Sequence, residues 1–220
     1  MSITAVIANH NYAHYIEACL QSAAHFCDEV LVYDDGSTDE SLDIIPEALL
    51  AGRRSTASGS ALWAFNKGID AAKCDYILFL DSDNYLVSRP GTEADYTYSD
   101  IRLVDGRDKP LGEWRYPGWP TTAEHALKNF HESASMPMPA GGAWRTAFLR
   151  ENGCRWIQWK TSRAAADFRT YIEWLQFGPT IAYRPETSLV FRIHAAQSSQ
   201  SPDKGRAMKE AALLARGYRL

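Results

Sequence analysis

The stretch that decides the fold is Asp75-Tyr76-Ile77-Leu78-Phe79-Leu80-Asp81-Ser82-Asp83. Residues 76–80 form an apolar run with the length and composition of a buried strand. The acidic triplet follows where that strand ends. Because parallel sheets bind ligands beyond the carboxyl ends of their strands, the sequence predicts a polar site at residues 81–83.

Strands and helices alternate along the first hundred residues. Strands are predicted near 3–8, 29–33 and 75–80, with only a stub of a strand near 53–56, and helices near 12–26, 40–50 and 59–72. This alternation predicts a mostly parallel α/β sheet with right-handed crossovers and flanking helices. A second acidic segment, residues 34–39, follows the second strand and reaches the same edge of the sheet.

The second half of the chain is less regular. Strands are predicted near 95–104, 180–183 and 188–193, helices near 122–130 and 162–177, and a loop rich in Gly, Pro and aromatic residues at 105–120. A C-terminal helix is predicted within 201–220, with Pro202 at an allowed first-turn position. Without an internal linker, residues 1–200 are expected to form one domain.

The composition excludes several classes of protein. The net charge of −4 and the absence of a basic cluster argue against nucleic-acid binding. The four cysteines are scattered, which indicates neither a zinc site nor a disulfide framework. No signal peptide or transmembrane segment is recognised, so we expect a cytoplasmic protein; contact with the inner face of a membrane stays open.

The acidic triplet has three interpretations. In an extended segment the side chains of Asp81 and Asp83 point to the same side and can converge on one hard cation, which would offset charge on a departing diphosphate. The triplet could instead be a polar turn. A phosphatase of the haloacid dehalogenase type also has two such aspartates, but on its first strand and not on its fourth.

The sequence resembles family 2 glycosyltransferases of the GT-A fold over nearly its whole length. Seven segments carry this resemblance in the family's order: 6–12 (VIANHNY), 30–39 (VLVYDDGSTD), 64–72 (AFNKGIDAA), 75–83 (DYILFLDSD), 98–100 (YSD), 141–145 (GGAWR) and 191–194 (FRIH). The resemblance implies a single Rossmann-like domain, with a nucleotide-binding half at about 1–100 and an acceptor-binding half at about 101–200.

The resemblance assigns nucleotide contacts to Asn9, Tyr12, Asp34, Asp35 and, with them, Asn66. A carboxylate suits this role because ribose hydroxyls and base N–H groups donate well to a charged acceptor. Asp34 and Asp35 also fit a turn that caps the following helix, and both roles can hold at once.

The resemblance divides the rest of the site among four residues. Asp83 and His194 would bind Mn²⁺ or Mg²⁺, and Asp81 would contact the nucleotide. Asp167, early in its predicted helix, would deprotonate the acceptor hydroxyl. Ala166 departs from the pattern, since a Glu is common at its position.

Two loops leave recognition open. Residues 57–60 lack the Asn or Lys often found after the third strand, so base recognition is not defined. Trp114, Tyr116 and Trp119 lie in the 105–120 loop, where they could form an aromatic platform for a sugar or could pack in the core.

The function expected from the resemblance is inverting, metal-dependent transfer of a sugar from a nucleotide-diphosphate donor, most commonly a UDP-sugar. The acceptor would be a hydroxyl of a saccharide or lipid-linked saccharide. The alternative is an inactive GT-A module that binds nucleotides or serves as a scaffold, which the missing Glu beside Asp167 and the short third strand motivate. A nucleoside diphosphate would bind to both, but only the enzyme would turn over its donor.

Overall fold

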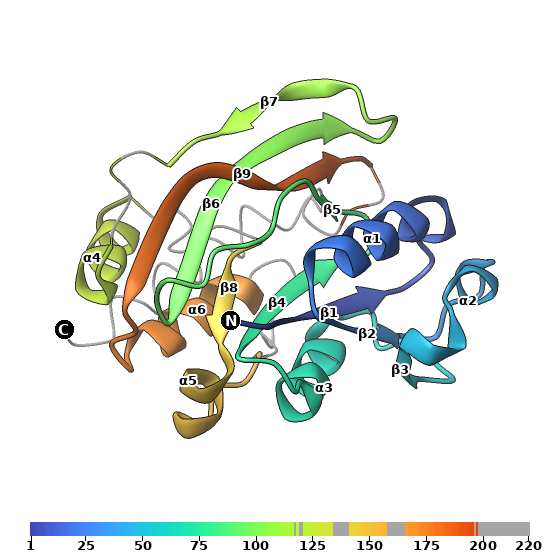
Figure 1. The fold of residues 1–220 in the computed structure, drawn as a ribbon, viewed down its shortest axis with the longest axis horizontal. Coiled ribbons are helices and arrows are strands. Elements are labelled where there is room, and N and C mark those ends of the chain that lie inside the picture. Colours follow the sequence, from blue (N-terminus) through green and yellow to red (C-terminus); the bar gives the residue numbers. More distant parts are fainter. Residues whose placement is uncertain (117, 119–120, 134–140, 158–165, 196, 198–220) are drawn as a thin grey trace.

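The computed structural model describes residues 1–116, 118, 121–133, 141–157, 166–195 and 197. Its strands are β1 (Ile3–Asn9), β2 (Glu29–Asp34), β3 (Leu50–Arg53), β4 (Tyr76–Asp81), β5 (Tyr85–Leu86), β6 (Tyr96–Asp105), β7 (Pro110–Trp114), β8 (Ala143–Arg145) and β9 (Ile181–Ile193). Within the described ranges they form one curled sheet in the order β3-β2-β1-β4-β8-β6-β9-β5, with β7 paired to β6 (Figure 1).

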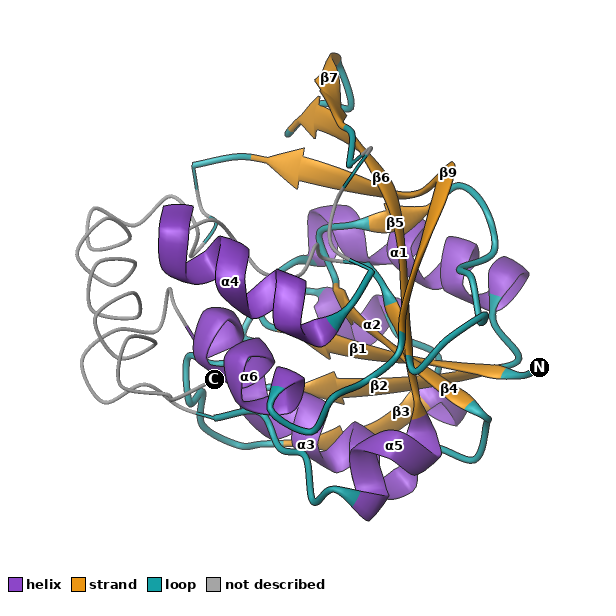
Figure 2. Ribbon diagram, turned by 90° about the vertical axis from the view of Figure 1, so that its left-hand side faces the viewer, coloured by secondary structure: helices purple, strands orange, loops and turns teal. Residues whose placement is uncertain are grey.

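Helices cover both faces of this sheet. They are α1 (Ala13–Phe26), α2 (Ser41–Ile44), α3 (Leu62–Ala71), α4 (Ala123–Ser133), α5 (Thr146–Glu151) and α6 (Ala166–Leu175), with a 3₁₀ turn η1 (Glu47–Leu49). One core holds α1 against one face, and a second core joins α3, α4, α5 and α6 on the other (Figure 2). Side chains of β1 alternate between the two cores, as the period of a strand requires.

The first half of the sheet is parallel, as predicted. β1 pairs with β2 on one side and with β4 on the other, and β3 extends the sheet beyond β2. The chain therefore first adds β2 and β3 on one side of β1 and then crosses to add β4 on the other side. This reversal of strand order creates a switch point at the carboxyl ends of β1 and β4. Open α/β sheets bind ligands in this kind of crevice.

The second half of the sheet corrects the expectation of a mostly parallel sheet. The short strand β8 pairs antiparallel with both β4 and β6, and β5 and β7 are antiparallel additions, while β6 and β9 are parallel. β8 can enter because Gly142, just before it, has no Cβ: one built there would overlap the Tyr96 ring. The sheet is therefore mixed.

Several element boundaries differ from those predicted. The predicted helix 40–50 is broken after Ile44, because Pro46 favours an extended conformation at Ile45 (ψ 117°), and β3 begins already at Leu50. The predicted strands 180–183 and 188–193 are one bent strand, β9, and the 105–120 loop contains β7. β5 and α5 are additional elements.

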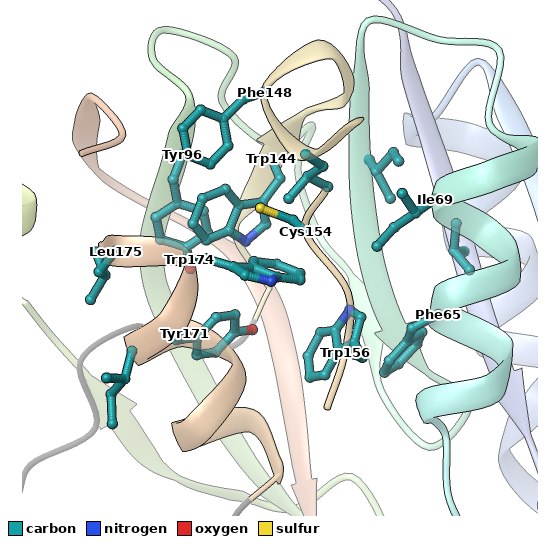
Figure 3. Packing of buried hydrophobic residues seen from close by; sticks show 14 of the residues in the cluster. Phe65, Ile69, Tyr96, Trp144, Phe148, Cys154, Trp156, Tyr171, Trp174 and Leu175 are labelled. Atoms are coloured by element: carbon teal, nitrogen blue, oxygen red, sulfur yellow. The ribbon is translucent and has the colours of Figure 1, made fainter. Parts of the chain in front are cut away.

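Aromatic side chains fill the core between the sheet and α6. Trp144 of β8 contacts Tyr96 at 4.5 Å and Trp174 at 5.0 Å between ring centroids (Figure 3). Trp156 bridges to α3 through Phe65 at 4.9 Å. These rings fix the start of α6, and therefore the position of Asp167, relative to β4.

None of the helices in the described ranges is long and apolar enough to cross a membrane. The predicted C-terminal helix at 201–220 lies outside the described residues.

Candidate active site

Most of the predicted site residues meet at the carboxyl edge of the parallel strands, and Asn66 is the exception. Asn9 pairs in register with Asp34, and Ala8 with Asp81. The backbone N–H of Ser82 extends this ladder by donating to the Ala8 carbonyl at 3.2 Å. The loop that follows β4 therefore lies directly at the switch point.

Asn9 and Asp34 form the floor of this edge. Asn9 Nδ2 donates to Asp34 Oδ2 at 2.8 Å and to Ser37 Oγ at 3.1 Å. The Ser37 N–H donates to Asp34 Oδ1 at 2.9 Å. Asp34 is fully buried, so in this structure its carboxylate holds the turn after β2. Helix α2 begins only at Ser41, and its N-cap side chain makes no hydrogen bond to it.

Asp35 is held by the loop that follows β3. Its carboxylate accepts the backbone N–H groups of Ser58 and Gly59 and the Ser58 hydroxyl, at 2.8 to 3.0 Å. Arg54 adds an ion pair at 3.4 Å. The loop 57–60, which lacks the Asn or Lys often found there, thus contacts the second aspartate through its backbone and the Ser58 hydroxyl.

Asn66 is engaged away from the acidic edge. Its amide donates to the Trp156 carbonyl at 3.0 Å and accepts the Trp156 N–H at 2.8 Å. Both polar ends of the side chain are therefore paired with backbone. The geometry gives Asn66 the role of fixing Trp156 against α3, and its predicted nucleotide contact finds no support here.

Three aspartates lie close enough to influence each other. Burial, followed by the charges of Asp83 and Asp167, raises the pKa of Asp81 well above its usual range. Asp81 is nevertheless exposed to solvent. The structure thus brings Asp167, at the start of α6, to the acidic triplet on β4.

Asp83 and His194, both predicted from the sequence to bind a metal, are in direct contact. Asp83 is 4% exposed, and its Oδ2 is 3.1 Å from His194 Nε2. Gln197 also donates to this oxygen, at 3.1 Å, and to the Arg192 carbonyl. Sequence reasoning missed Gln197, because no motif links it to Asp83 more than a hundred residues away.

Tyrosines complete the surroundings of the carboxylates. Tyr12 lies beside the acidic triplet: burial, followed by Asp83 and Asp81, raises its pKa. Its ring contacts His194 edge-on at 5.6 Å. Tyr171, which the sequence did not single out, lies beside Asp167 and Asp81, and burial followed by those charges raises its pKa.

Three buried polar atoms at this edge have no hydrogen-bond partner among the described residues: Asn9 Oδ1, Ser82 Oγ and Asp83 Oδ1. Such an atom costs about 1–3 kcal/mol, so folded proteins rarely leave several together. Their gathering at the ends of β1 and β4 marks the edge as a place where a ligand, ion or water completes the contacts.

The residues fit a divalent cation that is shared with a substrate. The unpartnered Asp83 Oδ1 is a suitable donor, and the nearby carboxylates supply negative charge. His194 Nε2 now lies 3.1 Å from Asp83 Oδ2 and would have to turn from this oxygen to a cation in order to bind it. No group of three or more His, Cys, Asp or Glu side chains suited to a metal is found in the described ranges. Mg²⁺ typically binds through one or two carboxylates plus phosphates and water, which matches a site of this kind.

Trp114 and Tyr116 of the 105–120 loop have different surroundings in the structure. Trp114, on β7, is 45% exposed and packs against Phe191 at 5.7 Å between centroids. The Tyr116 N–H donates to Asp100 Oδ1 at 3.0 Å, and Tyr183 donates to the same oxygen at 2.8 Å. Trp119 lies outside the described residues.

Comparisons with known proteins agree with this fold. Residues 4–87 match the model of glycosyl transferase family 2. An uncharacterised glycosyltransferase of Nostoc is 28% identical over 66% of this chain and 48% of that protein. The poly(ribitol-phosphate) beta-glucosyltransferase of Bacillus spizizenii is 32% identical over 50% of this chain and 20% of that protein. The chain therefore spans about half or less of these relatives.

Solved structures of Staphylococcus aureus TarS share the fold. TarS 1-349 in complex with UDP-GlcNAc aligns with a TM-score of 0.73 and 20% identity, over 97% of this chain and 66% of that chain. Its complex with UDP aligns with a TM-score of 0.69. Residues 4–87 of this chain are therefore similar to glycosyl transferase family 2, and nearly the whole chain shares its fold with TarS.

Proposed function

We propose that this chain is an inverting, metal-dependent glycosyltransferase that uses a nucleotide-diphosphate sugar. The observation that carries the proposal is the convergence of Asp81, Asp83, Asp167 and His194 at the carboxyl ends of β1 and β4. Each side chain is of a type that the reaction needs. The carboxylates can hold a cation and remove a proton, and the imidazole can bind the cation or the diphosphate.

Asp167 is the proposed base. Its carboxylate would take the proton of the acceptor hydroxyl, whose oxygen forms a bond to the anomeric carbon while the bond from that carbon to the diphosphate breaks. Attack opposite the leaving group inverts the configuration. Tyr171, beside Asp167, stays protonated because burial raises its pKa, so it cannot accept that proton in place of Asp167.

Asp83 and His194 are the proposed holders of Mn²⁺ or Mg²⁺. A bound cation would stabilise the negative charge on the departing nucleoside diphosphate. Asp81, Asn9, Tyr12 and the Asp34-Asp35 turn are proposed to bind the nucleoside. Asn66 is not proposed to contact the nucleoside directly. It acts indirectly, because it holds Trp156 against α3.

The donor and acceptor follow from the relatives. TarS binds UDP-GlcNAc in its crystal structure, so a UDP-sugar is the first donor to test. Named relatives act on poly(ribitol-phosphate), which makes polyol-phosphate polymers the first acceptors beside saccharides and lipid-linked saccharides.

The test is to incubate the protein with UDP-GlcNAc and Mn²⁺, with and without poly(ribitol-phosphate), and to measure UDP release and sugar transfer. Release that requires Mn²⁺ and falls in Asp167→Asn supports the proposal. Tight UDP binding without turnover of UDP-sugars that carry glucose, galactose or N-acetylglucosamine would instead support an inactive nucleotide-binding module.

A further inference from the structure

The Arg192 side chain is almost completely buried next to the acidic triplet. It is 3% exposed, and its guanidinium carbon lies 4.9 Å from the Tyr15 ring centre and 4.7 Å from that of Tyr85. Charged side chains are seldom this buried unless their donors are satisfied. The guanidinium group therefore has a defined set of partners.

Those partners join three separate segments. Nη1 donates to the Asp83 backbone carbonyl at 2.6 Å, while Nε and Nη2 donate to the two oxygens of Asp108 at 2.9 and 3.1 Å. The Arg192 N–H also donates to Asn84 Oδ1 at 3.0 Å. β9, the loop after β4 and the turn between β6 and β7 are thus tied together by one residue.

The turn that carries Asp108 is shaped for this contact. Asp108 has a left-handed backbone (φ 61°), which is uncommon outside glycine. Asp105 Oδ1 stabilises the turn by accepting the N–H groups of Arg107 and Lys109 at 2.8 and 3.0 Å. At Gly106 a Cβ would lie 3.0 Å from Tyr15 Oη and 3.3 Å from His194 Cβ.

The same turn therefore supports both residues that are proposed to hold the cation beside the diphosphate, Asp83 and His194. It contacts His194 at Gly106, and through Asp108 and Arg192 it holds the backbone of Asp83. Because Arg192 donates to the Asp83 carbonyl, it leaves the carboxylate available. Arg192 lies in β9 and His194 follows its last residue, and both side chains reach Asp83.

We propose that Arg192 and Asp108 are positioning residues that hold Asp83 and His194 in the arrangement required by the diphosphate and its cation. This inference rests on the proposed function. Residues that orient a metal's ligands typically change metal affinity or activity by about 10–100-fold when they are replaced. The effect should reach the diphosphate end of the ligand and spare the nucleoside.

The test is Asp108→Asn, since the Asp108 side chain is 51% exposed and Asn keeps its size and shape. Affinity for UDP with Mn²⁺ is measured by calorimetry, and affinity for uridine by ligand-observed NMR. We expect UDP affinity to fall about 10–100-fold and uridine affinity to change less than about twofold. Glu113→Gln is the control, because Glu113 also pairs with an arginine near this hairpin, the exposed Arg115, at 2.7 and 2.9 Å.

Arg192→Lys keeps the charge but loses the planar fork, so it should reproduce the loss, and the double variant should be no weaker than either single variant. Amide exchange in residues 81–86 without ligand should be faster in both variants than in the control. Unchanged UDP affinity, an equal loss for uridine, or additive losses would overturn the positioning role alone. A wild-type protein that binds no nucleoside diphosphate would overturn the proposed function as well.

Discussion

Replacing Asp83 by Asn removes one negative charge from a crowded site and keeps the shape of the side chain. In the wild type, Oδ1 is buried without a partner among the described residues, and the Asp83 charge lies close enough to Asp81 for the two to repel each other. An unpartnered buried polar atom costs about 1–3 kcal/mol. The variant avoids part of that cost, because burying a neutral amide costs less free energy than burying a carboxylate. The amide oxygen of the variant can still accept the hydrogen bond from Gln197.

We therefore expect the ligand-free variant to be at least as stable as the wild type, with a gain of up to about 1 kcal/mol. For a domain of this size that corresponds to a rise in midpoint of about 2–4 °C. A ligand at a hundred times its Kd stabilises the folded state by about 2.7 kcal/mol. UDP with Mn²⁺ should therefore raise the wild-type midpoint by about 5–11 °C, and the variant should lose most of this rise.

Thermal unfolding with and without UDP and Mn²⁺ measures both effects. Asp70→Asn is the control, since Asp70 is an exposed carboxylate paired with Arg155 at 2.8 Å. A ligand-free variant that melts several degrees below the wild type would show that the Asp83 carboxylate is structural. A full ligand-induced rise in the variant would remove Asp83 from the binding of the diphosphate.

Three further predictions follow from the same geometry. Asp167→Asn should lower turnover about 10²–10⁴-fold while the rise in midpoint caused by UDP persists, and near-normal turnover would exclude Asp167 as the base. Gly68→Ala should destabilise by about 1–3 kcal/mol, because its Cβ would overlap the Val6 side chain, and Val6→Ala in the same chain should recover part of the loss in urea unfolding. Burial raises the pKa of the Cys154 thiol to about 12. Above about pH 9 the thiol ionises in the unfolded protein but stays neutral in the folded one, which favours unfolding. The free energy of unfolding should therefore fall between about pH 9 and pH 12, relative to Cys154→Ala. Iodoacetamide should likewise leave this thiol unmodified at pH 8, and rapid alkylation would contradict its burial.

The central strands and the acidic edge were predictable from the sequence. Buried parallel strands are continuous apolar runs, so β1, β2 and β4 were recognised within one or two residues. Since the carboxyl ends of parallel strands share one edge, Asn9, Asp34 and Asp81 could be assigned to it before any contact was known. The helix predicted at 40–50 was wrong, although Pro46 was a local signal against it.

The sequence by itself determined which residue types lie at that edge, because strand length and polarity are local properties. The tertiary structure decided how they are held. Antiparallel β8 enters between β4 and β6 through a contact between Gly142 and Tyr96, which no local pattern encodes. Likewise, Arg192 and Gln197 reach Asp83 across more than a hundred residues of chain. Side chains so far apart in sequence are brought together only by the packing of the whole sheet.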